Sequence, residues 1–177
     1  MPTLKPVVNS SDHYTGNVNA TITLVEYGDF LCPYSKHAHE LMRQLLTQWS
    51  KEIIFVFRHF PLREIHRHAF AAAVAAEAAG RQGKFWKMYD LLFENQTKIT
   101  NNFILTMAHS IGLDMNQFVQ DSKDKRVLTK VENDFESGLL SVVNRTPSFF
   151  VNGYPLMSYD ESYRSLVSGI LEEAESL

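Results

Sequence analysis

Short apolar runs and longer amphipathic stretches alternate along the chain in an informative order. Thr21 to Tyr27 is a β-branched apolar run, and Ile53 to Phe57 is a second one. Runs of this kind, bounded by polar or glycine residues, predict buried strands. Between them, Lys36 to Trp49 has apolar residues at helical spacing, and Pro33 suits a first helical turn. This part of the chain therefore predicts a strand–helix–strand unit with parallel strands.

The middle of the chain has a different pattern, in which apolar residues recur only at helical spacing. Five segments show it: 67–82, 84–95, 101–111, 115–122 and 125–140. They are separated by glycines and by short polar stretches, which are typical breaks between helices. We predict an all-helical block here, with Asn101 and Asp114 as candidate N-caps of the helices that follow them.

Strand character returns near the end of the chain. Ser148 to Val151 is a short apolar run, and Tyr154 to Met157 is expected to pair back on it through the turn Asn152–Gly153. Asp160 to Leu177 has the pattern of an amphipathic helix. The predicted order is β-α-β, a helical block, then β-β-α, which places the protein in the α/β class.

The amino-acid composition argues against two classes of binding partner. The chain has 177 residues, of which 45% are hydrophobic and 21% are charged, as in one globular domain. A net charge of -3 argues against nucleic acid or an anionic membrane as a partner. No apolar run approaches the ~18 residues of a membrane span, and the first residues lack the apolar core of a signal peptide. We expect a cytoplasmic protein as the sequence stands, or a periplasmic one if a signal peptide has been removed.

The single cysteine, Cys32, is the sharpest chemical feature. One cysteine in the sequence forbids an internal disulfide and is too few for a cysteine-based metal site. Cys32 lies where the first predicted strand gives way to the first predicted helix. Backbone N–H groups and the helix dipole at such a position favour the thiolate, so a lowered pKa is expected. The alternative is a buried cysteine that acts only as a small apolar side chain.

Several segments together resemble one family. They are Leu24 to Tyr34 (LVEYGDFLCPY), Phe57 to Leu62 (FRHFPL), the alanine-rich segment around Ala71 to Ala79, Gly83 to Phe93, and Thr146 to Gly153 (TPSFFVNG). In this order they resemble the DsbA-like branch of the thioredoxin superfamily, with coverage from about Asp12 to the C-terminus. The resemblance implies a thioredoxin fold with an inserted all-helical domain. The thioredoxin-like domain would comprise residues 12–62 and 141–177, and the insertion residues 63–140.

The chain departs from this family at one position. The usual motif is Cys-x-x-Cys, whereas this chain has Cys32, Pro33, Tyr34 and Ser35. Serine has no thiolate chemistry and cannot resolve a mixed disulfide. The resemblance therefore implies a protein disulfide oxidoreductase or isomerase of monothiol type, which exchanges protein or glutathione disulfides through Cys32, with Ser35 and the helix N-terminus stabilising its thiolate. Two alternatives stay open: a non-catalytic peptide-binding module, and an engineered Cys-to-Ser form of a dithiol enzyme.

The resemblance implies roles for four further site residues. Thr146 and Pro147 match the family's cis-proline loop, which binds extended client peptides. Glu26 matches a buried acid that relays a proton, and Tyr34 would tune the surroundings of the thiolate. The expected partners are proteins or peptides that carry cysteine or a disulfide, with glutathione as a candidate co-substrate and no bound cofactor.

Seven histidines raise the question of a metal site. Two pairs, His37 with His39 and His66 with His68, are spaced two residues apart, which puts the members of a pair on different helical faces. No acidic ligand motif accompanies them. We therefore predict no metal site.

Overall fold

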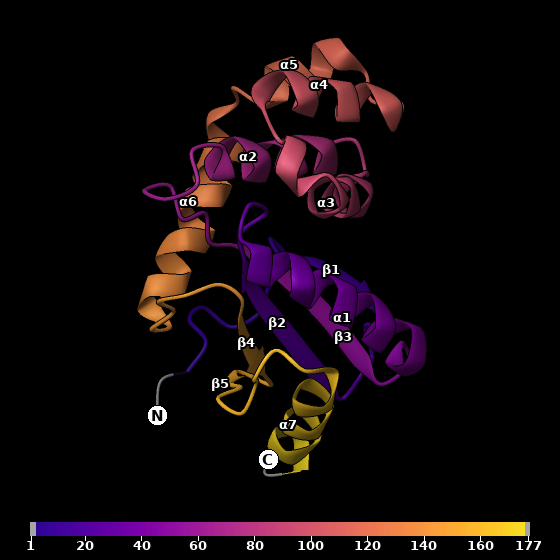
Figure 1. Ribbon diagram of the computed structural model, residues 1–177, viewed down its shortest axis with the longest axis vertical. Helices are drawn as coiled ribbons and strands as arrows, with labels where there is room; N and C mark the ends of the chain where they lie inside the picture. Colours follow the sequence, from indigo (N-terminus) through magenta and orange to yellow (C-terminus); the bar gives the residue numbers. More distant parts are fainter. Residues whose placement is uncertain (1–2, 176–177) are drawn as a thin grey trace. The chain divides into compact units, whose positions relative to one another are not determined.

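The structure is a computed structural model that describes residues 3–175. A five-stranded sheet has the order β1-β3-β2-β4-β5 (Figure 1). The strands are β1 (His13–Gly16), β2 (Ile22–Gly28), β3 (Ile53–His59), β4 (Ser148–Val151) and β5 (Tyr154–Pro155). The α-helices are α1 (Pro33–Trp49), α2 (Ala69–Gly80), α3 (Phe85–Glu94), α4 (Asn101–Ser110), α5 (Met115–Asp121), α6 (Lys125–Leu140) and α7 (Tyr163–Glu175), with a short 3-10 helix, η1 (Gln96–Lys98). Apart from β1 and η1, this is the predicted order of elements.

The chain divides into two compact units. The first contains residues 1–28, 37–58 and 136–177, and the second contains residues 29–36 and 59–135. The second unit thus holds the start of α1 as well as α2 to α5 and most of α6. The domain limits predicted from the sequence, at 62/63 and 140/141, stay a prediction.

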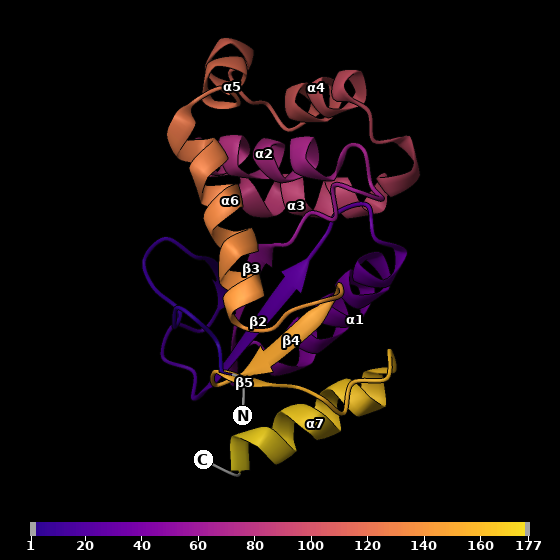
Figure 2. The same ribbon diagram turned by 90° about the vertical axis from the view of Figure 1, so that its left-hand side faces the viewer.

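The first unit is built around the apolar faces of β2, β3 and β4. Leu24, Val25, Phe57 and Val151 have no exposed surface, and Phe55 has almost none. Burial of a large apolar side chain stabilises a fold by ~1.5–3 kcal/mol, so this core carries much of the sheet's stability. β2 and β4 pair antiparallel, which places Glu26 opposite Phe149 (Figure 2).

β1 was not predicted, because its sequence, His-Tyr-Thr-Gly, has no apolar run. It lies at the edge of the sheet and pairs antiparallel with β3. Only every second residue of β1 is partly buried, whereas β3 is buried over most of its length. An edge strand needs one covered face at most, so its sequence gives little periodic signal.

The hairpin at the other edge was predicted correctly. Asn152 and Gly153 have φ of 50° and 90°, the left-handed conformation that a two-residue turn requires. The Asn152 side chain also accepts the Thr23 N–H at 2.8 Å. The returning strand is shorter than expected and ends at Pro155, since proline has no N–H with which to continue a ladder.

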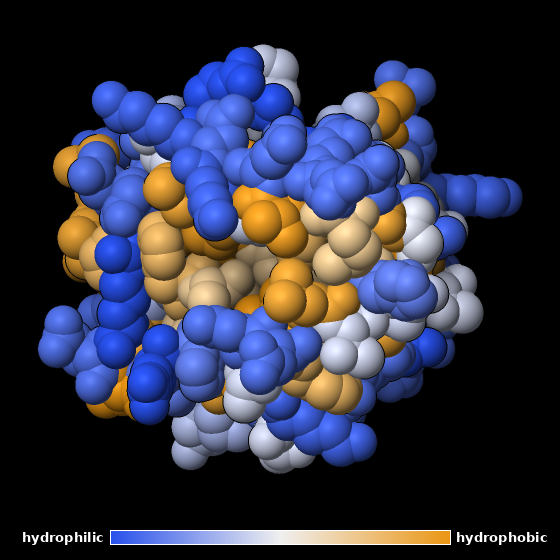
Figure 3. Space-filling view, turned by 90° about the horizontal axis from the view of Figure 1, so that it is seen from above, coloured by the Kyte–Doolittle hydropathy of each residue, from blue (hydrophilic) through white to orange (hydrophobic). Residues whose placement is uncertain are grey.

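The second unit packs around the alanine-rich helix α2. Nine of its residues are buried on all sides of the helix: Ala69, Ala72, Ala73, Val74, Ala75, Ala76, Glu77, Ala78 and Ala79. Small side chains let neighbouring helices approach closely, and α2 contacts α3, α4 and α5. On the face of this unit that carries α4 and α5, apolar side chains line a hollow among hydrophilic ones (Figure 3).

Two helix starts in this unit bear on the predicted caps. Asp114 caps α5 by accepting the Gln117 N–H, as expected. Asn101 does not cap α4; it is the first residue inside the helix, and Thr100 is the cap that accepts the Phe103 N–H. Both residue types suit an N-cap, and the pattern alone fixed the start only to within one residue. Across residues 3–175, none of the helices combines the length and apolarity that a bilayer crossing requires.

Candidate active site

Cys32 lies directly before Pro33, the first residue of α1. Its N–H donates to the Asp29 carbonyl at 3.0 Å, and its carbonyl accepts the Lys36 N–H at 3.1 Å, the first bond of the helical ladder. The cysteine is therefore at the helix start, where the sequence placed it. The residue is 5% exposed, so its surroundings contain little water. The first N–H groups of an α-helix have no partner within the helix and attract an anion.

The rest of the motif divides into exposed and buried residues. Pro33 and Tyr34 are exposed, whereas Ser35 is fully buried. The Ser35 hydroxyl oxygen accepts the Asp29 N–H at 3.3 Å. Ser35 thus binds the backbone that leads into the cysteine, and its place in the turn is fixed.

Asp29 stabilises the turn of residues 29–32 that leads into α1, called the cysteine turn below. Its side chain is buried, with one oxygen accepting the Leu31 N–H at 2.8 Å and the other accepting the Leu62 N–H at 3.0 Å. The second oxygen also lies 2.7 Å from Nδ1 of His66. The cysteine turn is therefore joined to the segment that follows β3. The sequence pattern gave no sign of this role, although Asp29 stands directly after a predicted strand.

Two further hydrogen bonds join the cysteine turn to η1. The Gln96 side-chain amide donates to the Phe30 carbonyl at 2.8 Å and to the Cys32 carbonyl at 2.9 Å. The ring of Phe30 itself packs against Phe93 and Tyr89, with centroids 4.9 and 5.9 Å away. The aromatic stripe of α3 is thus part of the core behind the cysteine turn.

Glu26 is buried in β2 without a matching partner. It has no exposed surface, and within residues 3–175 neither carboxylate oxygen has a hydrogen-bond partner. Burial raises the pKa of Glu26 to about 8, because an apolar site disfavours the charged form. The carboxyl group is therefore largely protonated at neutral pH.

Tyr159 belongs to the same unit as Glu26. Its hydroxyl also lacks a hydrogen-bond partner within residues 3–175. Burial raises the pKa of Tyr159 above its ordinary value, and the negative charge of Glu26, when present, raises it further. Both groups thus favour their protonated forms.

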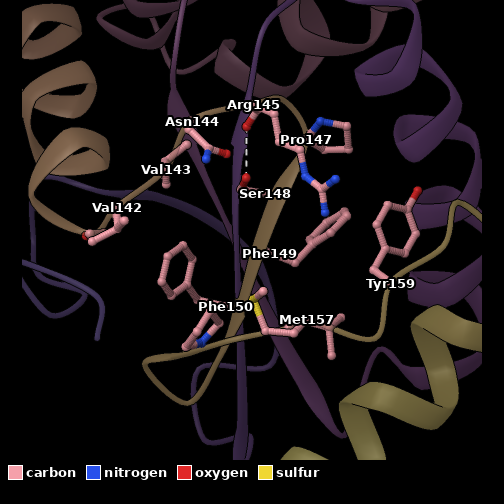
Figure 4. A pocket seen from close by; sticks show the side chains of 13 residues that line it. Val142, Val143, Asn144, Arg145, Pro147, Ser148, Phe149, Phe150, Met157 and Tyr159 are labelled. Carbon is pink, nitrogen blue, oxygen red and sulfur yellow. Dashed lines mark hydrogen bonds between the residues drawn. The ribbon is translucent and has the colours of Figure 1, made fainter. Parts of the chain in front are cut away.

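The Thr146–Pro147 peptide bond is cis, as the motif implied. Thr146 is buried, and Pro147 lines a pocket of about 710 Å³. Figure 4 shows the side chains around this pocket, which include Phe149, Tyr159 and Met157. The structure thus groups Cys32 and Ser35 with Asp29 in the second unit, and places Glu26, Thr146 and Pro147 in the first.

A separate polar cluster lies inside the second unit. His59, Glu77 and Asp134 are buried and offer ligand atoms within 4.8 Å of one another. Nε2 of His59 is 2.8 Å from Glu77, and the Lys130 ammonium is 2.6 Å from both oxygens of Asp134. Lys130 already supplies a positive charge to these carboxylates, so a metal ion would have to displace it.

Comparison with known proteins places this geometry in a family. The Thioredoxin family matches residues 8–168. Among curated proteins, a Na(+)/H(+) antiporter NhaA 1 of Salinispora arenicola is 43% identical over 148 residues, which are 84% of this chain and 22% of that protein. A Na(+)/H(+) antiporter NhaA 1 of Mycolicibacterium vanbaalenii is 40% identical over 152 residues, which are 85% of this chain and 25% of that protein. The chain thus spans about a quarter or less of these relatives.

Solved structures show the fold. BdbD from Bacillus subtilis, in its oxidised form, superposes with a TM-score of 0.82 at 20% identity, covering 93% of this chain and 94% of its own. A thioredoxin-like oxidoreductase from Silicibacter pomeroyi has a TM-score of 0.78 at 23% identity, covering 96% and 95%. The predicted thioredoxin fold with an inserted helical region, here α2 to α6, is confirmed. With this fold and the match over most of its length, the chain belongs to the Thioredoxin family.

Proposed function

We propose that the protein exchanges disulfides through Cys32 alone, on protein or glutathione disulfides. The observation that carries this proposal is the position of the only cysteine directly before Pro33 at the start of α1, with Ser35 where the second thiol of a dithiol motif would stand. A thiolate at this position is stabilised by the helix N-terminus. It is both a competent nucleophile and a good leaving group.

The reaction is a pair of thiol–disulfide exchanges. The Cys32 thiolate attacks one sulfur of a substrate disulfide, the substrate S–S bond breaks, and the departing thiolate takes a proton from the solvent. A thiol such as glutathione then attacks the mixed disulfide and releases the Cys32 thiolate. One disulfide and one thiol are consumed and one of each is formed, so no outside oxidant is needed. Ser35 cannot complete the cycle, which makes an external thiol necessary.

Two buried groups support this chemistry in our proposal. The hydroxyl of Ser35, whose oxygen accepts the Asp29 N–H, has one proton with which to stabilise the thiolate. Glu26, with a pKa of about 8, holds a proton that it can give or take near neutral pH. We propose Glu26 as the proton relay, and Tyr34, which is 54% exposed, as a residue that meets the client.

The proposed clients are extended peptides that bind beside Pro147. The pocket at this residue includes Val142 and Met157, whose exposed fractions are 66% and 78%. Exposed apolar side chains around a concave surface favour an apolar side chain from a partner. We therefore infer that clients carry an apolar side chain that this pocket binds.

The first test is adduct formation with oxidised glutathione, followed by intact-protein mass spectrometry. The wild type is expected to gain one glutathione, which an added thiol removes, and Cys32→Ala is expected to gain none. Iodoacetamide at neutral pH should alkylate Cys32 faster than it alkylates the cysteine of an unfolded peptide. A thiol that reacts no faster and forms no adduct would instead support the non-catalytic binding module.

We also propose that this chain binds a Na(+)/H(+) antiporter. What supports this is the 38–43% identity to segments of proteins that carry this name. The test is binding of the wild-type chain to a purified antiporter encoded in the same genome, in detergent, with an unrelated membrane transporter as control. A Kd below ~10 μM for the antiporter alone supports the proposal. Equal or no binding to the two membrane proteins contradicts it.

A further inference from the structure

Gln96 makes an unusual pair of contacts with the cysteine turn. It is the first residue of η1 and lies 64 positions after Cys32 in the chain. Its one NH2 group donates to two backbone carbonyls, those of Phe30 at 2.8 Å and of Cys32 at 2.9 Å. An amide nitrogen has two protons to donate, so these two bonds use both of them.

Side-chain and backbone donors together hold the carbonyls of the cysteine turn. The residue after Cys32 is Pro33, which has no N–H and so removes one backbone donor from the turn. The Cys32 carbonyl also accepts the helical N–H of Lys36 at 3.1 Å. Gln96 therefore constrains the orientation of the Phe30 and Cys32 carbonyl groups, one before and one after the cysteine nitrogen.

We propose that Gln96 is a positioning residue for the thiol-exchange reaction. It holds the carbonyl oxygens of Phe30 and Cys32 toward its own amide, and so keeps these negative dipole ends from turning toward the sulfur. The first N–H groups of α1 then dominate the field at the thiolate. This inference rests on the proposed function of Cys32 and adds that Gln96, the first residue of η1, sets the reactivity of the thiol.

The structure offers a matched control in the same unit. Gln82 also ties a side-chain amide to backbone groups, since it donates to the Asp114 carbonyl at 3.1 Å and accepts the Asp114 N–H at 2.9 Å. Gln82 and Gln96 are both half-buried. Only the Gln96 contacts reach the cysteine turn, so the two residues separate positioning from general stability.

The experiment compares Gln96→Met with Gln82→Met, because methionine keeps the length of the side chain and removes its hydrogen bonds. Both variants should melt within a few degrees of each other. The rate of Cys32 alkylation by iodoacetamide at about pH 6 should fall about 3–10-fold in Gln96→Met and stay unchanged in Gln82→Met. The dependence of the alkylation rate on pH should differ from that of the wild type only for Gln96→Met.

Equal alkylation profiles in the two variants would overturn the proposal. If Gln96→Met fails to fold, Gln96→Asn replaces it, since a side chain one methylene shorter cannot reach both carbonyls; Gln82→Asn is then its control. The wild-type adduct with oxidised glutathione is measured alongside. If the wild type forms no adduct with oxidised glutathione, the proposed function is rejected. If the wild type forms the adduct but the two glutamine variants have identical alkylation profiles, only the role of Gln96 is rejected.

Discussion

Two acidic residues three positions apart, Glu26 and Asp29, are both buried but in different surroundings. Asp29 accepts two backbone N–H groups and contacts His66, so burial does not leave its oxygens without partners. Glu26 has no hydrogen-bond partner within residues 3–175, and its pKa rises to about 8. The first residue stabilises a turn, whereas the second favours its neutral form.

Glu26 should make stability depend on pH. Its pKa in the folded state, about 8, is above the ordinary value of 4.5 that applies to the unfolded chain. The unfolded state therefore loses its proton first as pH rises, and stability falls between about pH 4.5 and pH 8. Glu26→Gln removes this titration. The stability of Glu26→Gln relative to the wild type should increase by about 3 kcal/mol between pH 4.5 and pH 7.

Urea denaturation of both proteins at several pH values measures this difference. Any other titrating group contributes equally to the two proteins, so the difference between their curves isolates Glu26. Parallel curves would show that Glu26 keeps an ordinary pKa in the folded protein. They would also remove the basis for its role as a proton relay.

At the scale of elements, helix starts depend on single side chains. Thr100 caps α4 by accepting the Phe103 N–H, and Asp114 caps α5 in the same way. By contrast, the N-cap residues of α2 and α3, His68 and Lys84, make no side-chain capping hydrogen bond. Most residues of α2 are buried, and α3 is amphipathic with one buried face. These two helices are therefore stabilised by packing rather than by capping.

Thr100→Ala should therefore lower the free energy of unfolding by ~1 kcal/mol, since one N–H at the start of α4 loses its partner. Thr106→Ala, at an exposed position inside the same helix, is the matched control. It should change stability by less than ~0.5 kcal/mol, because alanine favours a helix interior. Urea denaturation measures the free energy of unfolding of the two variants. An equal decrease in both would contradict the capping role of Thr100.

At the scale of the whole molecule, buried polar contacts join segments that lie far apart in the sequence. Arg58 pairs with Asp12 at 2.8 Å, and its guanidinium also donates to the Pro6 carbonyl and the Tyr27 hydroxyl. Tyr27 in turn is 2.8 Å from the Ser137 hydroxyl. These contacts join the N-terminal segment, β3, β2 and the end of α6 within the first unit. A buried ion pair gives little net stability, but loss of one member leaves a costly charge.

The amino-acid sequence was enough to predict the order of elements other than β1 and η1, the hairpin at Asn152 and Gly153, and the position of Cys32 before α1. Each follows from local rules, namely the period of apolar residues, the backbone freedom of a turn, and proline at a helix start. The resemblance to the DsbA-like family added the thioredoxin fold, which the comparisons confirm, and the cis bond at Pro147, which the structure contains.

The polar groups that surround the cysteine turn could be identified only from the folded chain. Gln96 and His66 stand among residues with no distinctive pattern, and nothing in their spacing relates them to Cys32 or Asp29. The sequence of β2 likewise does not reveal that the Glu26 carboxylate has no hydrogen-bond partner within residues 3–175. The physical reason is that periodicity reports which face of an element is buried, whereas a hydrogen bond between distant segments depends on the path of the chain in three dimensions.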